Sequence, residues 1–197
     1  MESSYSEQHP LEPFLPAGAR LLMLGSFPPP RRRWSMEFYY PNLQNDMWRI
    51  FGHLFFGDRN HFLHSDRKAF DRERIVTFLT GKGIALYDTA AAVRRLKDNA
   101  SDQYLEIVEA TDLGALLRRL PECRTLAATG GKAAETAART LGCDVPAVGG
   151  YSLFGFEGRE MRLWRMPSTS RAYPMTLERK AEAYGRLFDA LFGRSSG

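Results

Sequence analysis

Four short segments of this sequence combine small residues with polar side chains that could do chemistry, and each follows an apolar run. Asp88 supplies a carboxylate, and Ser168 and Ser170 supply hydroxyls of the kind that bind phosphate. Gly130-Gly131-Lys132 opens a helical stretch, an arrangement that can bind an anion, but it lacks the spacing of a nucleoside-triphosphate loop. The four segments are residues 25–30, 88–92, 129–132 and 167–172.

Asn45 stands directly before an apolar stripe with helical spacing, and two interpretations of it remain open. An asparagine here is a good helix N-cap, which is a structural role that needs no chemistry. Its amide also offers both a donor and an acceptor, so the same side chain can orient a water molecule or bond a ligand. The two roles coexist only if capping leaves part of the amide free.

The elements that must position these residues can be read from hydrophobic patterning. Short apolar runs bounded by turn residues predict buried strands at 21–24, 84–87, 125–128 and 162–166. Helices are predicted between them: from Met47, from Phe70 to Gly83, from a Thr111 cap to Pro121, over 131–140, and after a Thr176 cap. We therefore expect an α/β fold with three αβα layers around a central four-stranded, mostly parallel sheet. The polar segments lie beyond the carboxyl ends of the strands, where such sheets bind ligands.

Length and composition limit the remaining possibilities. The 197 residues predict a single domain over 16–193 between flexible tails at 1–15 and 194–197. A net charge of +4 is compatible with a polyanionic partner without establishing one. Cys123, Cys143 and the four histidines lack metal-site spacing, so we expect free thiols, no metal and no cofactor. No apolar run approaches ~20 residues, and we expect a cytoplasmic monomer without a membrane partner.

Several blocks in order along the chain resemble the uracil-DNA glycosylase superfamily, and the hypoxanthine-DNA glycosylase-like branch most of all. They are GSFP at 25–28, YYP at 39–41, NDMW at 45–48, GIALYD at 83–88, TGGKAAE at 129–135 and MPSTS at 166–170. The resemblance spans about residues 20–190. It implies a uracil-DNA glycosylase-like fold and hydrolytic excision of a deaminated base, hypoxanthine or uracil, from single- or double-stranded DNA during base-excision repair. If the source is bacterial, the protein is expected at the nucleoid.

Such an enzyme must flip the nucleotide into a pocket, stack its base and read its hydrogen-bonding edge. The resemblance implies that Asn45 is catalytic. Tyr40 is a candidate for stacking on the base, Tyr39 is a candidate for the core, and a capping role for Asp88 is as compatible with its position as base reading. The residues expected to bind the base are Gly25, Ser26, Phe27, Tyr40 and Asp88, and those expected at the DNA phosphates or as a wedge are Lys132, Ser168, Thr169, Ser170 and Arg171.

Two departures from the superfamily pattern keep alternatives open. No Asp or Asn stands between Gly25 and Pro30, and Met166 occupies the position of the usual histidine. A catalytically weak or inactive DNA- or nucleotide-binding module of the same fold is therefore the main alternative, followed by a hydrolase acting on a small phosphorylated substrate. No lysine is placed as a Schiff-base nucleophile, so the enzyme is expected to be a glycosylase without lyase activity.

Overall fold

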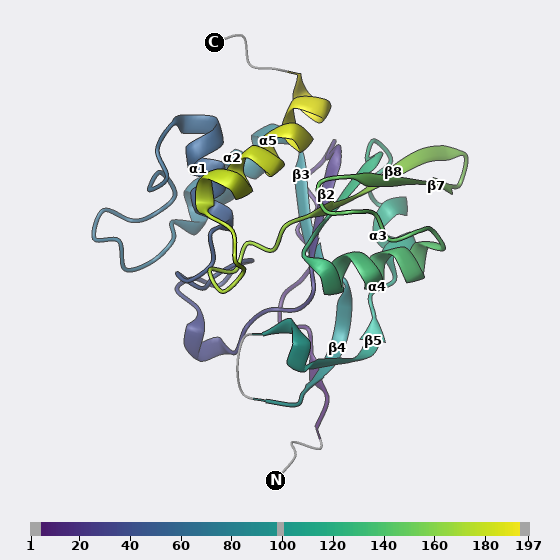
Figure 1. Ribbon diagram of the computed structural model, residues 1–197, viewed down its shortest axis with the longest axis horizontal. Helices are drawn as coiled ribbons and strands as arrows, with labels where there is room; N and C mark the ends of the chain where they lie inside the picture. Colours follow the sequence, from purple (N-terminus) through teal and green to yellow (C-terminus); the bar gives the residue numbers. More distant parts are fainter. Residues whose placement is uncertain (1–4, 98–100, 194–197) are drawn as a thin grey trace.

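The computed structural model describes residues 5–97 and 101–193, and the tail expected at 194–197 lies outside the described residues. A five-stranded sheet runs through the centre in the order β3-β2-β6-β8-β7 (Figure 1). Its strands are β2 (Leu21–Gly25), β3 (Ile84–Asp88), β6 (Thr125–Thr129), β7 (Tyr151–Phe156) and β8 (Arg159–Met166). The four predicted strands are β2, β3, β6 and β8, and they are parallel to one another.

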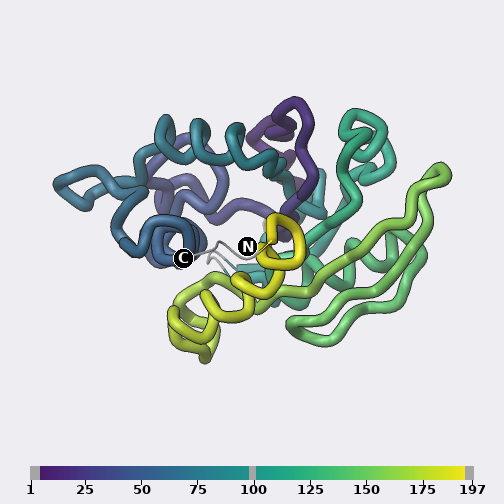
Figure 2. Tube along the Cα trace, turned by 90° about the horizontal axis from the view of Figure 1, so that it is seen from above, coloured from purple at the N-terminus to yellow at the C-terminus, as the bar shows by residue number. Residues whose placement is uncertain are grey.

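Helices cover both faces of this sheet, which confirms the predicted αβα layers. One face carries α1 (Met47–Phe56), α2 (Arg72–Lys82) and α5 (Leu177–Phe192), and the other carries α3 (Leu113–Arg118) and α4 (Gly131–Leu141) (Figure 1). Figure 2 shows α5 in yellow beside α1 in blue, with the β7–β8 hairpin in green extending away from them. Alternate residues of β2 face opposite layers: Met23 packs under α1 and α5, and Leu22 under α3 and α4.

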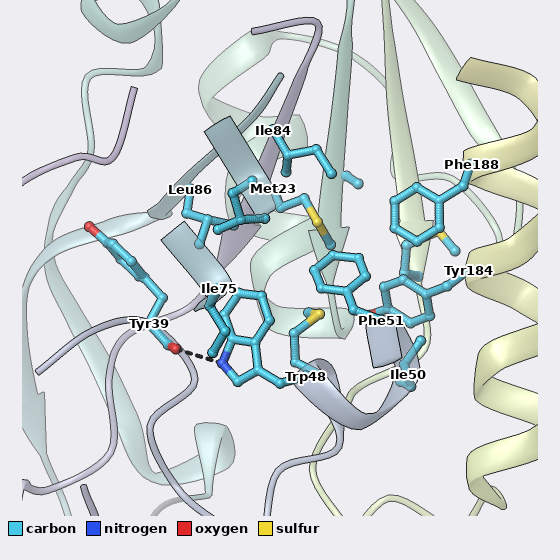
Figure 3. Close-up of a cluster of buried hydrophobic side chains, with 14 of the residues drawn as sticks. Met23, Tyr39, Trp48, Ile50, Phe51, Ile75, Ile84, Leu86, Tyr184 and Phe188 are labelled. Carbon is cyan, nitrogen blue, oxygen red and sulfur yellow. Dashed lines mark hydrogen bonds between the residues drawn. The ribbon is translucent and has the colours of Figure 1, made fainter. Parts of the chain in front are cut away.

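The larger core cluster is aromatic and fixes the segment that precedes α1. Trp48 is fully buried, and its indole N–H donates to the Tyr39 carbonyl at 3.0 Å (Figure 3). Phe51 packs between Trp48 and Phe188 with ring centroids 5.4 and 5.2 Å away. Because Tyr39 is buried in this cluster, its neighbour Tyr40 has a fixed position at the carboxyl end of β6, where it contacts Thr129.

Two parts of the fold were missed by the sequence patterning. The fifth strand, β7, pairs antiparallel with β8 at the sheet edge, and Tyr151 and Leu153 stay exposed on it, so it shows no continuous apolar run. A second sheet has the order β1-β4-β5, from β1 (Glu7–Gln8), β4 (Ala90–Arg95) and β5 (Leu105–Ala110). Short 3₁₀ helices, η1 (Arg31–Arg33) and η2 (Asp102–Tyr104), complete the elements.

The expected tail at 1–15 is ordered from residue 5 onward. Glu7 and Gln8 pair with Val93 and Ala92 of β4, and Phe14 forms backbone hydrogen bonds with Leu86 of β3 at 2.9 and 3.0 Å. A polar composition suggested a loose end, but these contacts join residues about 70 to 90 positions apart and have no local signature. Backbone pairing therefore joins parts of residues 5–15 to both sheets.

Most helix boundaries follow the predicted signals. Gly83 ends α2 in a left-handed conformation, and Thr176 caps α5 by accepting from Arg179 N at 3.3 Å. The cap of α3 is Asp112 rather than Thr111, whose hydroxyl donates instead to the Asp88 carbonyl at 2.7 Å. Within the described part of the chain, no helix has the length and apolar character needed to cross a membrane.

Candidate functional site

A cleft of about 760 Å³ opens at the carboxyl ends of β2, β3, β6 and β8. Four loops that are distant in sequence contribute to its lining, as expected for a parallel sheet. Every residue for which the sequence predicted a site role lines this one cleft, so the predicted set converges in space. These residues are Gly25, Ser26, Phe27, Tyr40, Asn45, Asp88, Lys132, Ser168, Thr169, Ser170 and Arg171.

Gly25 allows a carboxylate to sit directly against the backbone of the first turn. A Cβ at this position would lie 2.5 Å from Asp88 Oδ1 and 3.2 Å from the Tyr40 hydroxyl. No side chain fits in that space unless the two groups move. The glycine is therefore required by the close approach of Asp88 and Tyr40, which brings both polar groups to the same end of the cleft.

Asp88 is paired with a histidine that the sequence did not connect to it. His9 Nε2 lies 2.7 Å from Asp88 Oδ2, and both side chains are almost completely buried. His9 Nδ1 lies 3.1 Å from Leu11 N and 3.0 Å from the Leu11 carbonyl, and Nε2 is the donor to the Asp88 carboxylate, which only accepts when it is ionised. Asp88 Oδ1 makes no hydrogen bond with the described residues and remains available at the cleft. Neither a simple capping role nor an isolated base-reading carboxylate describes this arrangement.

Asp102 brings a second carboxylate to the first turn, where the sequence showed none. The Ser26 hydroxyl donates to Asp102 Oδ2 at 2.9 Å, although the two residues are 76 positions apart. Burial raises the pKa of the Asp102 carboxyl above its ordinary value, and the nearby charge of Asp88 raises it further. The carboxylate therefore stands in the cleft in a proton-accepting position that no local motif revealed.

Lys132 holds this acidic segment in place rather than facing solvent. Its ammonium donates to the carbonyls of Asp102, at 3.0 Å, and of Leu105. Two of its three protons are thus committed to the backbone of the loop. Lys132 lines the cleft as predicted, but its hydrogen bonds hold the backbone at Asp102 in place.

Tyr40 lies in the cleft, as the sequence suggested, and Tyr39 is buried in the core but also lines the cleft. Tyr40 adopts a left-handed backbone conformation with φ of 50°, which is strained for a bulky side chain. Thr129 donates its hydroxyl proton to the Leu24 carbonyl at 3.3 Å, so the Tyr40 hydroxyl is the donor in their 2.8 Å hydrogen bond. Burial is the main cause that raises the pKa of both tyrosines, and the phenols stay protonated at neutral pH.

Asn45 lies one residue before the N-cap of α1, which is Asp46, so the N-cap expected at Asn45 is wrong by one position. Asn45 Oδ1 accepts from Met47 N at 2.9 Å at the start of α1, so the oxygen serves the helix. Its NH₂ group makes no hydrogen bond with the described residues, and the side chain lines the cleft. The oxygen of the side chain is therefore committed to Met47 N, and the NH₂ group is a donor on a residue of the cleft lining.

Backbone pairing with the final loop fixes Asn45. Asn45 and Ser170 form an antiparallel bridge, and Asp46 N donates to the Thr169 carbonyl at 2.8 Å. Ser168 and Ser170 also act as turn residues, because their hydroxyls accept from Ser170 N and Ala172 N at 3.3 Å. Both serines also line the cleft.

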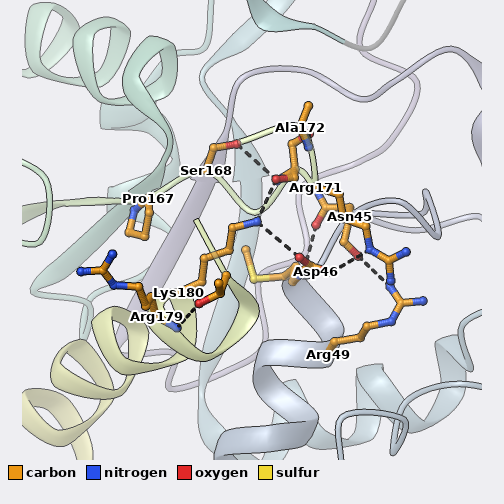
Figure 4. Close-up of polar contacts among 12 residues, drawn as sticks. Asn45, Asp46, Arg49, Pro167, Ser168, Arg171, Ala172, Arg179 and Lys180 are labelled. Carbon is orange, nitrogen blue, oxygen red and sulfur yellow. Dashed lines mark hydrogen bonds and ion pairs between the residues drawn. The ribbon is translucent and has the colours of Figure 1, made fainter. Parts of the chain in front are cut away.

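A buried lysine behind this loop was missed by the sequence reasoning. Lys180 is fully buried and donates to Asp46 Oδ2 at 3.3 Å and to the Ser170 carbonyl at 2.8 Å (Figure 4). Arg171 Nε donates to the other oxygen of Asp46 at 3.1 Å. The signal was present, since Lys180 lies one turn before Tyr184 on the inward face of α5.

Comparison with known proteins supports the fold. No family model matches the chain, and no curated protein matches it. A solution NMR structure from Methanosarcina acetivorans, described as a "putative Uracil DNA glycosylase", is 24% identical. The alignment covers 90% of this chain and 96% of that one, with a TM-score of 0.58. The chain therefore has a uracil-DNA glycosylase-like fold.

Proposed function

We propose that this chain is a DNA glycosylase that hydrolyses the N-glycosidic bond of a deaminated base, hypoxanthine or uracil, flipped into the cleft. One observation carries the proposal: the predicted site residues, which come from different glycosylase-like blocks of the sequence, all line one cleft at the carboxyl ends of the strands of a uracil-DNA glycosylase-like sheet. A binding cleft of this size can enclose a flipped nucleotide, whereas a base inside a duplex is out of reach of fixed side chains.

Three side chains of the cleft lining are suited to hold the base. Tyr40 and Phe27 supply aromatic surface on the cleft lining. Asp88 Oδ1 can accept a hydrogen bond from a ring N–H of the base, and the His9 contact keeps the carboxylate oriented. Uracil and hypoxanthine both present an N–H beside a carbonyl, so this contact accepts either base.

Two other groups are suited to the bond-breaking step. As the glycosidic bond breaks, positive charge develops on the sugar and negative charge on the departing base. The Asn45 NH₂ group is a fixed donor for that negative charge or for the attacking water. The Asp102 carboxylate can accept a proton from water or stabilise the positive sugar, and its contact with Ser26 fixes its position.

The product is expected to be an abasic site in an intact strand. A lyase step needs a neutral amine at the sugar. Lys180 is buried against Asp46, and Lys132 is bonded to two carbonyls, so neither lysine is free to attack. Strand breaks should therefore appear only after alkali treatment of the product.

The test is base release at enzyme excess from oligonucleotides that contain uracil, hypoxanthine, xanthine or a thymine mismatch. The proposal predicts release of uracil or hypoxanthine. If all four substrates remain intact, the proposed activity is wrong.

A non-catalytic DNA-binding module remains the second candidate, and Met166 is the observation that favours it. This side chain is fully buried and adds no polar group to the cleft. Tight binding to a duplex with a tetrahydrofuran abasic analogue, together with no release of any base, would support this candidate.

A further inference from the structure

A second open cavity of about 640 Å³ lies beside the cleft and is lined by four arginines. They come from three separate parts of the chain: α1, the loop between α1 and α2, and the final loop. The arginines are Arg49, Arg59, Arg67 and Arg171. Asp46 is the one acidic residue among the described residues that line it.

Arg49 forms the half-buried wall of this cavity. It donates to the carbonyls of Leu43 and Asn45 at 2.8 and 3.1 Å, and its guanidinium lies 5.3 Å from the centre of the Phe70 ring. Burial lowers the pKa of Arg49, and the like charge of Arg171 lowers it further. Figure 4 shows the two guanidinium groups near each other beside Asn45. Two cations held this close are stabilised by an anion between or above them.

The acidic groups around the cavity do not neutralise it. Asp46 already pairs with both Lys180 and Arg171, and Glu178 pairs with Arg59 at 2.8 Å in an exposed position. The side chain of Arg67 makes no ion pair or hydrogen bond with the described residues. The backbone of Arg67 has a φ of 58° in a turn that its N–H closes by donating to the His64 carbonyl at 2.8 Å.

Arg171 lines both the cavity and the cleft, so the two are continuous at this side chain. A DNA strand that places one nucleotide in the cleft must continue on either side of it. Guanidinium groups bind phosphate oxygens through paired N–H donors. We propose that the arginine cavity, formed by Arg49, Arg59, Arg67 and Arg171, is a subsite for a backbone phosphate of the strand flanking the nucleotide in the cleft. The inference rests on DNA being the ligand of the cleft, as in the proposed function.

Arg67→Glu tests the subsite, and Lys68→Glu is its matched control. The two residues are adjacent and exposed, and the two substitutions change the net charge equally, but only Arg67 lines the cavity. The measurement is the affinity for a duplex with a tetrahydrofuran abasic analogue over a series of salt concentrations. Loss of one phosphate contact should lower the slope of log K against log salt by about one. We expect that change, with a roughly ten-fold weaker affinity, for Arg67→Glu and not for Lys68→Glu.

Neutral methylphosphonate linkages identify the phosphate. Each phosphate within a few nucleotides of the analogue is replaced in turn. The proposal predicts one position at which the neutral linkage weakens binding of the wild type but has no further effect on Arg67→Glu. Equal salt slopes for the two variants, or additive effects at every position, would overturn it.

A further experiment distinguishes two possible ligands of the arginine cavity, a DNA phosphate and a small free anion. Inorganic phosphate is titrated while thermal unfolding is followed in the wild type and in Arg67→Glu. If phosphate stabilises only the wild type, and Arg67→Glu binds the duplex normally, the cavity is a small-anion site and the proposal is wrong. These binding measurements do not depend on base release, so an inactive protein that still shows the Arg67 effect would refute the activity while supporting the subsite.

Discussion

The cleft and the arginine cavity meet at Arg171. The cleft contains carboxylates and the cavity contains mostly guanidinium groups, and the two sets differ in how they are paired. In the cleft, Asp88 and Asp102 are each fixed by one partner, a buried histidine and a serine hydroxyl. In the cavity, the guanidinium groups outnumber the acidic residues and Arg67 makes no such bond within the described chain. Fixed, desolvated groups suit charge that develops during a reaction, whereas surplus exposed charge suits an anion that is already present. Variants of the cleft should therefore change rates, and variants of the cavity should change affinity.

The largest effect is expected at Lys180, which contacts Asp46 of the cavity lining and Ser170 of the cleft lining. Lys180→Ala removes a fully buried cation and leaves Asp46 and the Ser170 carbonyl without that donor. We expect a loss of about 3–5 kcal/mol in the free energy of unfolding, because breaking a buried pair leaves an uncompensated charge. Denaturant unfolding measures it, with the exposed neighbour Arg179→Ala as control. A change within ~0.5 kcal/mol would mean that Lys180 does not support the loop.

Asp102→Asn should separate activity from stability. The amide oxygen can still accept from Ser26, but the variant cannot take a proton, and we expect base release to slow by about 10²-fold. Because burial raises the pKa of Asp102, its ionised form costs stability in the folded state at neutral pH. The variant should therefore unfold at a temperature no lower than the wild type at pH 7.

The pH dependence of the rate of base release tests the role of the same carboxylate. If the ionised form is required, the rate of the wild type should fall as the pH drops through the raised pKa of Asp102. Asp102→Asn should be slow at every pH and should lack this acid limb. An acid limb that persists unchanged in the variant would assign it to another group.

His9→Phe should disturb the end of the cleft that holds Asp88. It keeps an aromatic ring near Phe27 and Tyr87 but removes the donor to Asp88. An unpaired buried carboxylate should cost about 1–3 kcal/mol of stability and raise the KM for the preferred base. His64→Phe is the control, since His64 is exposed and its ring nitrogen lies 3.8 Å from Asp71. Equal effects of the two variants would show that the contact of His9 with Asp88 does not support the site.

Arg59→Gln should have the smallest effect. Arg59 already pairs with Glu178 on the surface, so its contribution to an anion is partly offset. We expect a loss of affinity of about two- to three-fold for the abasic duplex, and base release at saturating enzyme equal to that of the wild type. A slower rate at saturation would show that the cavity takes part in the reaction step.

The central sheet could be predicted because its strands are continuous apolar runs buried on both faces, such as 21–24. The edge strand β7 and the short strand β1 could not, because exposed side chains and long-range pairing leave no local pattern. The same holds for the site. Asp88 and Asn45 lie at strand and helix ends that patterning predicts. His9 contacts Asp88 from 79 positions away and Asp102 contacts Ser26 from 76 positions away, and such long-range contacts leave no local pattern.

The most direct test of the central claim is single-turnover base release by Asn45→Ser. Serine can still accept from Met47 N and keep the start of α1, but it lacks the NH₂ group that faces the cleft. We expect the wild type to release uracil or hypoxanthine, and we expect Asn45→Ser to bind an abasic analogue equally well but to release the base at least about 10²-fold more slowly. Equal rates for the two proteins, or an inactive wild type at enzyme excess, would contradict it.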